Sequence, residues 1–514
     1  MTKLKSSSLN WGLKHTLFQK DNSLFPFPFE FDIIKNQWNF LRDELLKIEI
    51  QDYKWKEIRG LIIPKSEKTF RKASQLNPLD YIIFSAIIKE IGKKIEKKRI
   101  PVKDNIVFSS RFRPDIEGRM YDNKNAWKNF WEQSRKMANK YKYIVTTDIV
   151  DFYNQIYHHT IENQLMSCGI HMNYINAIKN LIQSFTGKVS RGIPIGPHSF
   201  HLLAELSLIP VDEYLKLKGT KFCRFLDDYH FFCNSKEEGL IAIYDFVNVL
   251  DDHKLVMQYQ KTKILHSESF KKTIDNKITE DPINDEEKEI IITIKQVSDD
   301  PYDSFTIEEL KADELDKFSK DKIEKIFKEL LLNSPPNYEH IRWFLRRLSQ
   351  VGIGTGVDFI IRNIDEFKPA LADAMDYLKN AKSNYVGNWN KIGNELHNVL
   401  FQPLVQKNEY MRLIIVNLFS KIIDLDHIEK LIDLYDNVPS NVKRKILLAA
   451  IVVNAYPFLK SFKTEIRNMD PWLKRAMIYG SKTFPEDEKG FWLRSINKLE
   501  IMTLLDKAII KELS

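Results

Sequence analysis

The sequence predicts an α+β first half followed by an all-α second half. Two short runs in the first half, YKYIVTTDIV and TKFCRFLDDYHFFC, are rich in β-branched and aromatic residues and therefore predict strands. They alternate with the longer runs DYIIFSAIIKEIGKKIEKK and SFHLLAELSLIPVDEYLKLK, whose apolar residues recur at helical spacing. The second half contains amphipathic segments of 10–16 residues separated by Pro, Gly and Asn, which predict helices.

Length and composition exclude several classes of protein. The 514 residues, of which 43% are hydrophobic and 29% charged, predict a globular chain of two to four domains. Three cysteines exclude a disulfide scaffold and a four-cysteine zinc site, and they favour a reducing cytoplasm. No run approaches the ~20 apolar residues of a bilayer span, and the first residues lack the apolar core of a secretion signal. We therefore expect a cytoplasmic protein that does not enter a membrane.

Charge is spread unevenly along the chain. Residues 273–316 hold 15 acidic residues against 4 lysines, so this segment carries −11 and the rest of the chain +19. A basic body with an acidic connector fits nucleic-acid or nucleotide binding, and equally a lysine-rich solvated surface. We interpret 273–316 as a connector between a mixed domain, 55–272, and a helical domain, 317–514. An N-terminal segment, 1–54, is expected to pack on the mixed domain.

The helical domain shows a degenerate repeat. Two of its helices begin alike, with Pro439-Ser-Asn-Val-Lys-Arg and Asp470-Pro-Trp-Leu-Lys-Arg. A Pro-containing turn followed by an apolar helix with Lys-Arg, recurring after a few tens of residues, favours stacked helix pairs of the HEAT kind. An irregular helical bundle is the alternative.

Three segments carry the side chains on which chemistry could depend. Asp148 ends an apolar strand, which holds its carboxylate rigidly at the solvent-open end. Gly192-Ile-Pro194-Ile-Gly196 is a turn that leads into a helix and allows close backbone approach to a flat or phosphorylated ligand. Asp227 and Asp228 lie at a hairpin tip, where like charges are tolerated if a divalent cation lies between them and a third carboxylate. Oxygen ligands without Cys or His favour two Mg²⁺ or Mn²⁺ ions, which can activate a 3′-hydroxyl and stabilise a leaving pyrophosphate.

Each segment taken singly has an ordinary structural interpretation. An Asp-Asp pair is most often a turn former, a Gly-x-Pro-x-Gly segment is usually only a loop, and Asp148 could cap a helix. The order and spacing of the three segments are far more specific than any one of them.

In that order, the segments resemble the palm of reverse transcriptases. Asp148 resembles the first catalytic aspartate, and Asp227 and Asp228 resemble the pair in the Tyr-x-Asp-Asp box, here Phe225-Leu-Asp-Asp. Gly192-x-Pro194-x-Gly196 with Ser199 resembles the loop under the incoming nucleotide and template base. Three further matches are the Lys-Thr strand pair His253–Lys263, the looser fingers hairpin Lys65–Lys72 and the Phe-Arg-Pro box Ser109–Pro114. The resemblance covers roughly residues 55–270.

This resemblance implies a fold and a set of roles. The fold is a right-hand polymerase with fingers and a palm built on an antiparallel sheet, here followed by an all-α HEAT-like domain. Asp148 and Asp227 would bridge both metal ions, with Asp228 assisting and the Ile149 carbonyl contributing. The main-chain N–H groups of Asp151 and Phe152 would contact the triphosphate of a deoxynucleotide.

The resemblance also assigns side chains around the nucleotide. Tyr153 stands where the family has its steric gate against a ribose 2′-OH, although an ordinary core aromatic is the alternative. Lys65 and Arg71 would neutralise triphosphate charge, and Pro194 and Gly196 would lie under the nucleotide. Lys261 would protonate or orient the leaving pyrophosphate, or lie on the surface.

Departures from the family pattern narrow the prediction. Ile195 stands where the family often has Gln, so one hydrogen bond to the nucleotide or template is lost and templated copying is less favoured. A palm followed by a helical domain resembles the bacterial abortive-infection (Abi) polymerases of the AbiK-like type. That likeness implies antiphage defence, template-independent DNA synthesis primed from a protein tyrosine, a covalently attached single-stranded DNA product and a homo-oligomer. No motif identifies the priming tyrosine. The alternatives are an RNA-templated reverse transcriptase with an RNA partner, and a non-catalytic palm on an α-repeat scaffold.

Overall fold

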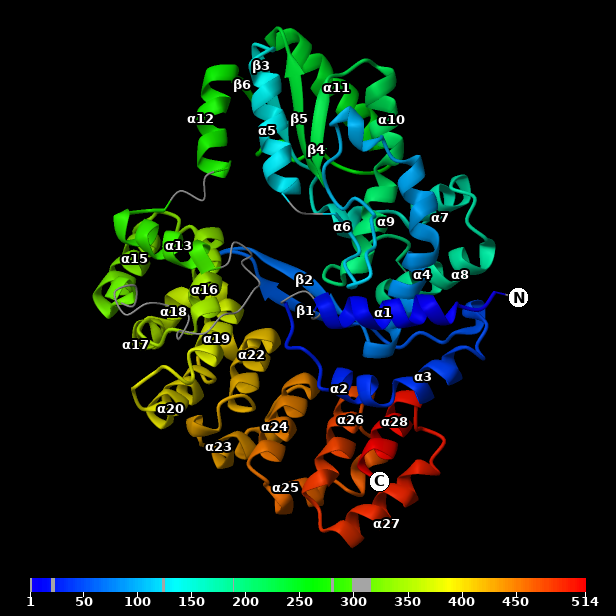
Figure 1. Cartoon of the computed structure of the whole chain (residues 1–514), viewed down its shortest axis with the longest axis vertical. Coiled ribbons are helices and arrows are strands. Elements are labelled where there is room, and N and C mark those ends of the chain that lie inside the picture. The colour runs from blue at the N-terminus through cyan, green and yellow to red at the C-terminus, as the bar shows by residue number, and fades with distance from the viewer. Residues whose placement is uncertain (1, 20–23, 123–124, 188, 279–281, 298–315) are drawn as a thin grey trace. The chain divides into compact units, whose positions relative to one another are not determined.

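The computed structural model describes residues 2–19, 24–122, 125–187, 189–278, 282–297 and 316–514 (Figure 1). The chain divides into two compact units. The first contains Met1–Gly60 and Ala73–Glu280, and the second contains Leu61–Lys72 and Asp281–Ser514. Residues 279–281 and 298–315 of the acidic segment lie outside the described residues.

The first unit contains a four-stranded antiparallel sheet, which lies beside α5 (Ala126–Ala138), α11 (Lys236–Asp252) and α12 (Ser267–Ile278) (Figure 1). Its strands are β3 (Tyr143–Thr147), β4 (Phe222–Phe225), β5 (Asp228–Cys233) and β6 (Lys263–His266), in the order β4-β5-β3-β6. The two predicted strand runs are therefore confirmed. The two strands predicted over His253–Lys263 do not form. That region contributes only an isolated β-bridge at Met257 and the first residue of β6.

Alternation along β5 explains how the sheet is covered on both faces. Tyr229 and Phe231 contact Phe246 of α11 (Lys236–Asp252), with ring centroids 4.7 and 5.3 Å apart. The intervening His230 stacks on Phe130 of α5 (Ala126–Ala138) at 4.6 Å on the opposite face. Successive strand residues point to opposite faces, so an unbroken apolar run is buried between two helical layers.

The long helix α4 (Pro78–Lys98) packs against α1 (Ser6–Gln19) of the N-terminal segment and against α9 (His201–Ser207). The side chain of Asn77 caps its first turn and Pro78 occupies the first position, as expected of a helix start. Helix α1 (Ser6–Gln19) packs so closely on α4 that a Cβ at Gly12 would lie 2.5 Å from the Ile82 carbonyl oxygen. Other helices of this unit are α2 (Glu30–Asn36), α3 (Trp38–Leu45), α6 (Phe152–Gln155), α7 (His158–Ser167), α8 (Met172–Thr186) and α12 (Ser267–Ile278).

The helical run that follows the glycine loop is broken into two helices. Helix α9 (His201–Ser207) ends before Leu208, and α10 (Ile209–Leu217) begins after it. Pro210 is the second residue of α10, where it has no N–H to continue the hydrogen bonds of the preceding turn.

The β-hairpin of β1 (Arg59–Pro64) and β2 (Phe70–Gln75) has its tip, residues 61–72, in the second unit. The amides of Lys65 and Ser66 both donate to the Thr69 carbonyl, at 2.8 and 3.2 Å, and close the turn. Arg342 of α16 (Tyr338–Val351) donates to the Lys65 carbonyl at 2.8 Å. The tip is therefore held by a helix of the second unit.

The other described residues of the second unit form helices and their connections, as predicted. Six helices pack each against the next, namely α16, α19 (Leu371–Asn380), α22 (Glu409–Phe419), α24 (Ser440–Val452), α26 (Pro471–Gly480) and α28 (Leu504–Leu513) (Figure 1). The others are α13 (Asp285–Val297), α15 (Lys320–Leu332), α17 (Val357–Arg362), α18 (Ile364–Phe367), α20 (Trp389–Val399), α21 (Pro403–Lys407), α23 (Ile428–Asp433), α25 (Tyr456–Ser461) and α27 (Glu486–Asn497). Within the described residues, no helix is long and apolar enough to cross a membrane.

The similar beginnings of α24 and α26 have a structural explanation. Arg444 of α24 and Arg475 of α26 are both buried, and both guanidinium groups lie over the ring of Trp472, at 5.2 and 4.7 Å from its centroid. Arg444 also donates to the Trp472 carbonyl at 2.6 Å. Arg444 therefore joins α24 to α26, and Arg475 contacts the same tryptophan from within α26.

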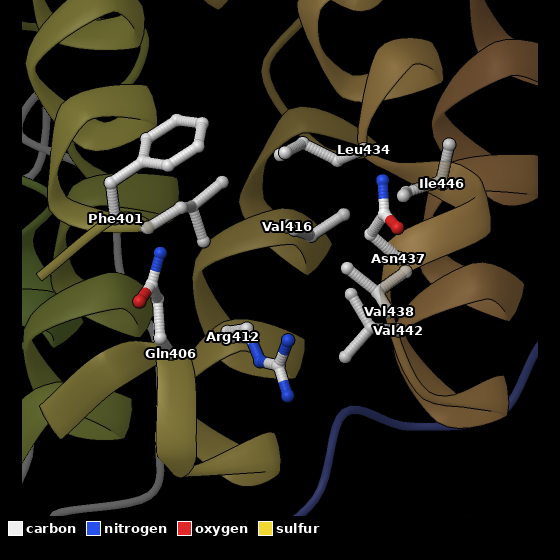
Figure 2. A pocket seen from close by; sticks show the side chains of 10 residues that line it. Phe401, Gln406, Arg412, Val416, Leu434, Asn437, Val438, Val442 and Ile446 are labelled. Carbon is white, nitrogen blue, oxygen red and sulfur yellow. The ribbon is translucent and has the colours of Figure 1, made fainter. Parts of the chain in front are cut away.

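A cavity of about 370 Å³ lies in the second unit beside α22 and α24 (Figure 2). Its walls are mainly aliphatic and include Val416 and Val442. Figure 2 shows the guanidinium of Arg412 pointing into this space. The Nε atom of Arg412 is buried and has no hydrogen-bond partner among the described residues.

Candidate active site

The register of the central sheet brings the three predicted aspartates to one edge. Strands β3 and β5 are antiparallel, with Thr147 opposite Tyr229, so the end of β3 lies beside the beginning of β5. Asp148 follows Thr147 directly, and Asp228 precedes Tyr229. Asp227 lies in the two-residue turn between β4 and β5. Three carboxylates that are up to 80 positions apart in the sequence therefore meet at one edge of the sheet.

The charges at this edge act strongly on one another. Burial raises the pKa of Asp227 to about 8, and repulsion by Asp228 and Asp148 contributes to that rise. Lys261 approaches the same group from the turn before β6, and its Nζ lies 2.5 Å from Asp148 Oδ2. The hydrogen bond to Asp148 raises the pKa of Lys261, and the Asp228 and Asp227 carboxylates raise it further. The predicted lysine and the three aspartates thus form one cluster.

Main-chain hydrogen bonds hold the segment around Asp148 in place. The Gln258 amide donates to the Asp148 carbonyl at 2.7 Å, and the Val150 amide donates to the Val256 carbonyl at 2.8 Å. Ile149 between them is buried and bridges to Met257. The carboxylate of Asp148 therefore projects from a segment that is paired like a short strand.

The donor atoms fit a hard divalent cation. Asp148 Oδ1 is buried and has no hydrogen-bond partner among the described residues, so it is free to bind a cation. A bound cation would also relieve the repulsion between the Asp227 carboxylate and the carboxylates of Asp228 and Asp148. In the part of the chain that the structure describes, no three acidic, histidine or cysteine side chains lie close enough together to hold a metal ion, so the three aspartates share one edge of the sheet without forming a closed set of ligands. The other carboxylate oxygen of Asp148, Oδ2, forms an ion pair with the Lys261 ammonium.

The segment after Asp148 carries the predicted nucleotide contacts. Asp151 has a φ of +46° and accepts a hydrogen bond from the Asn154 side chain at 2.7 Å. Phe152 is buried, whereas Tyr153 is half-buried and its hydroxyl is hydrogen-bonded to His201 Nδ1 at 2.5 Å. Burial raises the pKa of Tyr153 far above its ordinary value, and the nearby Asp227 charge adds to the rise. Tyr153 therefore lies close to the aspartate cluster as a neutral phenol.

The glycine loop packs against this segment. The amides of Gly192 and Ile193 donate to the carbonyls of Ile156 and Tyr153, at 2.8 and 3.0 Å. Gly192 and Gly196 have φ values of +93° and +133°, which residues with a Cβ rarely adopt. Pro194 between them is buried, and Gly196 is half-buried. The Ser74 amide of β2 donates to the Ile195 carbonyl at 2.7 Å, so the main chain of the loop is fixed at this position.

The two side chains predicted to bind the triphosphate from the fingers hairpin belong to the second unit. Lys65 and Arg71 are both exposed and belong to the hairpin tip, residues 61–72, of the second unit. Their proposed contact with a triphosphate stays a prediction.

Several side chains beside the site received no role from the sequence, although Ser109 begins the Phe-Arg-Pro box. His201 holds the Tyr153 hydroxyl. Ser109, Glu205 and Arg224 are completely buried behind the Asp227 turn. A signal was present for Glu205, because it is the only charged residue in the apolar run of α9 and a buried carboxylate requires a partner. Its partners lie far away in the sequence and have no local pattern.

Comparison with known protein families gives a match over the palm segments and their neighbours in sequence. Residues 63–310 match the family model described as reverse transcriptase (RNA-dependent DNA polymerase). The chain contains a reverse-transcriptase domain. Domains of this family are nucleotidyltransferases, so the aspartate cluster is the candidate polymerase active site. No curated protein sequence matches the chain.

Similar solved structures include fungal telomerases. The telomerase of Candida tropicalis without its C-terminal domain is 13% identical, with a TM-score of 0.32, and the match covers 46% of this chain and 55% of that chain. A second structure of the C. tropicalis telomerase, in its apo form, is 12% identical, with a TM-score of 0.33, and the match covers 73% of this chain and 74% of that chain. Candida albicans telomerase in complex with a telomeric RNA fragment is 11% identical, with a TM-score of 0.32 and coverage of 77% and 69%. The chain thus spans about half the length of the first of these structures.

Proposed function

We propose that this protein is a metal-dependent DNA polymerase of the reverse-transcriptase type that acts in antiphage, abortive-infection defence. The observation that carries the polymerase proposal is the meeting of Asp148, Asp227 and Asp228 at one sheet edge within a reverse-transcriptase domain. Decay to a non-catalytic scaffold is disfavoured because all three carboxylates are present and one of them, Asp227, remains buried in repulsion with the others.

Two Mg²⁺ or Mn²⁺ ions are the proposed cofactors. Asp148, Asp227, Asp228 and the Ile149 carbonyl would hold them, and bound ions would supply charge neutralisation at the attacking and leaving oxygens. The chain's own residues would orient the nucleotide. The Tyr153 ring would exclude a ribose 2′-hydroxyl. The main-chain amides of Asp151 and Phe152 would bind the triphosphate.

The finer proposals are template independence, priming from a protein tyrosine and a homo-oligomeric state. Ile195 supports the first, because an aliphatic side chain in the nucleotide loop offers no hydrogen bond to a template base. The stack α16, α19, α22, α24, α26 and α28 supports the HEAT-like description of the helical domain. No tyrosine is assigned as the primer.

RNA-templated synthesis is the second candidate function. The matched family is described as an RNA-dependent DNA polymerase, and that description favours an RNA partner. The two candidates differ in whether the product sequence follows an added template.

A labelling experiment tests both candidates. Purified protein is incubated with Mg²⁺ and radiolabelled deoxynucleotides without primer or template, and the product is run on a denaturing protein gel before and after protease digestion. Label that stays with the protein and becomes a DNA ladder after digestion is the expected result. Extension that occurs only on an added primer annealed to RNA would show the templated enzyme instead.

Matched variants connect that activity to the site. Asp227→Asn should abolish incorporation while the protein stays folded. Asp251→Asn changes an aspartate whose side chain is 77% exposed at the end of α11, and it should leave incorporation unchanged. Normal incorporation by Asp227→Asn would contradict the proposed active site. Plaque counts on bacteria that express the wild-type protein or Asp227→Asn test the defence role.

A further inference from the structure

The turn that carries Asp227 has an unfavourable backbone conformation. Phe225 pairs with Asp228 across the hairpin, so Leu226 and Asp227 alone form its loop. Leu226 has a φ of +52°, in the left-handed region that two-residue hairpins usually fill with Gly, Asn or Asp. Because a leucine strongly prefers negative φ values, some other interaction must hold the turn in this conformation.

Both main-chain groups of Leu226 are held by side chains from the interior. The Leu226 amide donates to Ser109 Oγ at 2.8 Å, and the Leu226 carbonyl accepts from Arg224 Nη1 at 3.2 Å. The Ser109 hydroxyl in turn donates to the Glu205 carboxylate. Ser109, Glu205 and Arg224 are all fully buried, so these contacts are protected from water.

The acceptor Glu205 is itself held rigidly. Arg99 and Arg224 bind its carboxylate at 2.7 and 2.9 Å. Arg224 also forms a two-pronged interaction with Asp212, at 2.7 and 2.6 Å. Paired groups of this kind have little freedom to move when they are buried, so they fix the position of the Ser109 hydroxyl.

We infer that Ser109 is a positioning residue for nucleotide transfer, acting through the Leu226 main chain to hold the Asp227 carboxylate at the sheet edge. The inference rests on the proposed polymerase function. Ser109 meets this turn at the Leu226 amide, and among the described residues no hydrogen bond joins it to Asp227. Without its hydroxyl, the Leu226 amide loses its partner and the left-handed conformation loses its compensation, so the turn relaxes and displaces the adjacent Asp227.

Ser109→Ala tests this inference in the full-length protein. The kcat for deoxynucleotide incorporation should be roughly tenfold lower. A tenfold change corresponds to the free-energy cost of placing a non-glycine residue in the left-handed region. The KM for the deoxynucleotide should stay close to wild type, and the melting temperature should fall by only a few degrees, as expected for the loss of a buried hydrogen bond. Ser134→Ala is the matched control, because Ser134 is equally buried and contacts Cys223 of β4, yet it makes no contact with the turn. It should leave kcat unchanged.

A double-mutant cycle separates positioning from general support of the fold. Glycine adopts positive φ without penalty, so a Leu226→Gly turn no longer depends on the Ser109 hydroxyl. In that background Ser109→Ala should lower kcat by less than about twofold. A roughly tenfold loss in both backgrounds, or full activity of Ser109→Ala alone, would overturn the inference. An inactive wild-type protein would overturn the proposed function and this inference together.

Discussion

Replacement of Glu205 by Gln tests whether the buried charges behind the active site stabilise the fold. Glu205 is fully buried on α9 and binds two guanidinium groups, Arg99 at 2.7 Å and Arg224 at 2.9 Å. Glutamine keeps the shape of the side chain and one acceptor oxygen but removes the charge. Two arginines would then share an interior that has lost one compensating carboxylate.

The expected loss of stability is large. Removal of one partner from a buried ion pair costs about 3–5 kcal/mol, and the remaining amide oxygen places Glu205→Gln near the lower value, about 3 kcal/mol. Domains are typically stable by about 5–15 kcal/mol, so this is a substantial fraction. In a unit of this size, each 1 kcal/mol lowers the melting temperature by about 2–4 °C, which predicts a decrease of about 10 °C.

Urea unfolding and thermal melting measure the effect against a surface control. Glu44→Gln removes the partner of Lys47, in a pair whose side chains are 40% and 68% exposed. Exposed pairs contribute at most about 1 kcal/mol, so this control should shift the melting temperature by only a few degrees. If Glu205→Gln is no more destabilised than Glu44→Gln, the buried charges do not stabilise the fold and the reasoning is refuted.

The difference in stability between wild type and Glu205→Gln should depend on pH. Burial by itself would raise the pKa of Glu205, but Arg224 and Arg99 outweigh it and hold this pKa below the ordinary 4.5. A lowered pKa means that the charge contributes its full stability above about pH 4.5 and loses it as the pH falls through the lower folded value. The gap between wild type and Glu205→Gln should therefore be constant near neutral pH and should narrow in acid.

Three further substitutions have expected outcomes. Lys261→Met should tighten Mn²⁺ binding about fivefold in calorimetry, since the ammonium no longer competes for Asp148 Oδ2 and a half-exposed pair is worth about 1 kcal/mol. Tyr153→Ala should raise ribonucleotide incorporation relative to deoxynucleotide incorporation by roughly tenfold or more, because the ring that would meet a 2′-hydroxyl is gone. Arg412→Met should stabilise the helical unit by about 1 kcal/mol in urea unfolding, because it removes the buried Nε that lacks a partner and keeps the aliphatic stem.

Matched variants control two of these measurements. Lys254→Met removes a lysine that pairs with exposed Asp251 at 3.5 Å, and it should leave Mn²⁺ affinity unchanged. Arg362→Met breaks an ion pair to Glu324 at 2.6 Å and should not stabilise the protein. Unchanged metal affinity in Lys261→Met would contradict the competition for Asp148, and unchanged nucleotide choice in Tyr153→Ala would contradict the gate. A less stable Arg412→Met protein would show that the guanidinium has a partner in solution.

Most elements of the palm follow from local sequence, although the strand pair predicted over His253–Lys263 does not form. The strand runs around Asp148 and Asp227, the helical run from Asp80 and the Asp-Asp turn were predictable, because side-chain periodicity and turn chemistry act between residues a few positions apart. The resemblance to reverse transcriptases used the same local segments. The helical second half followed for the same reason, from its repeated amphipathic runs.

Tertiary structure decided how these elements meet. The register that places Thr147 opposite Tyr229, and so Asp148 beside Asp228, depends on packing of the whole sheet. The hydroxyl of Ser109 reaches the Leu226 amide across 117 positions of the sequence, and the placement of the Lys65 hairpin tip in the helical unit is just as remote. Such contacts form only when the chain closes long loops around a common core, and no local pattern encodes which distant partner will complete a buried charge or a strained turn.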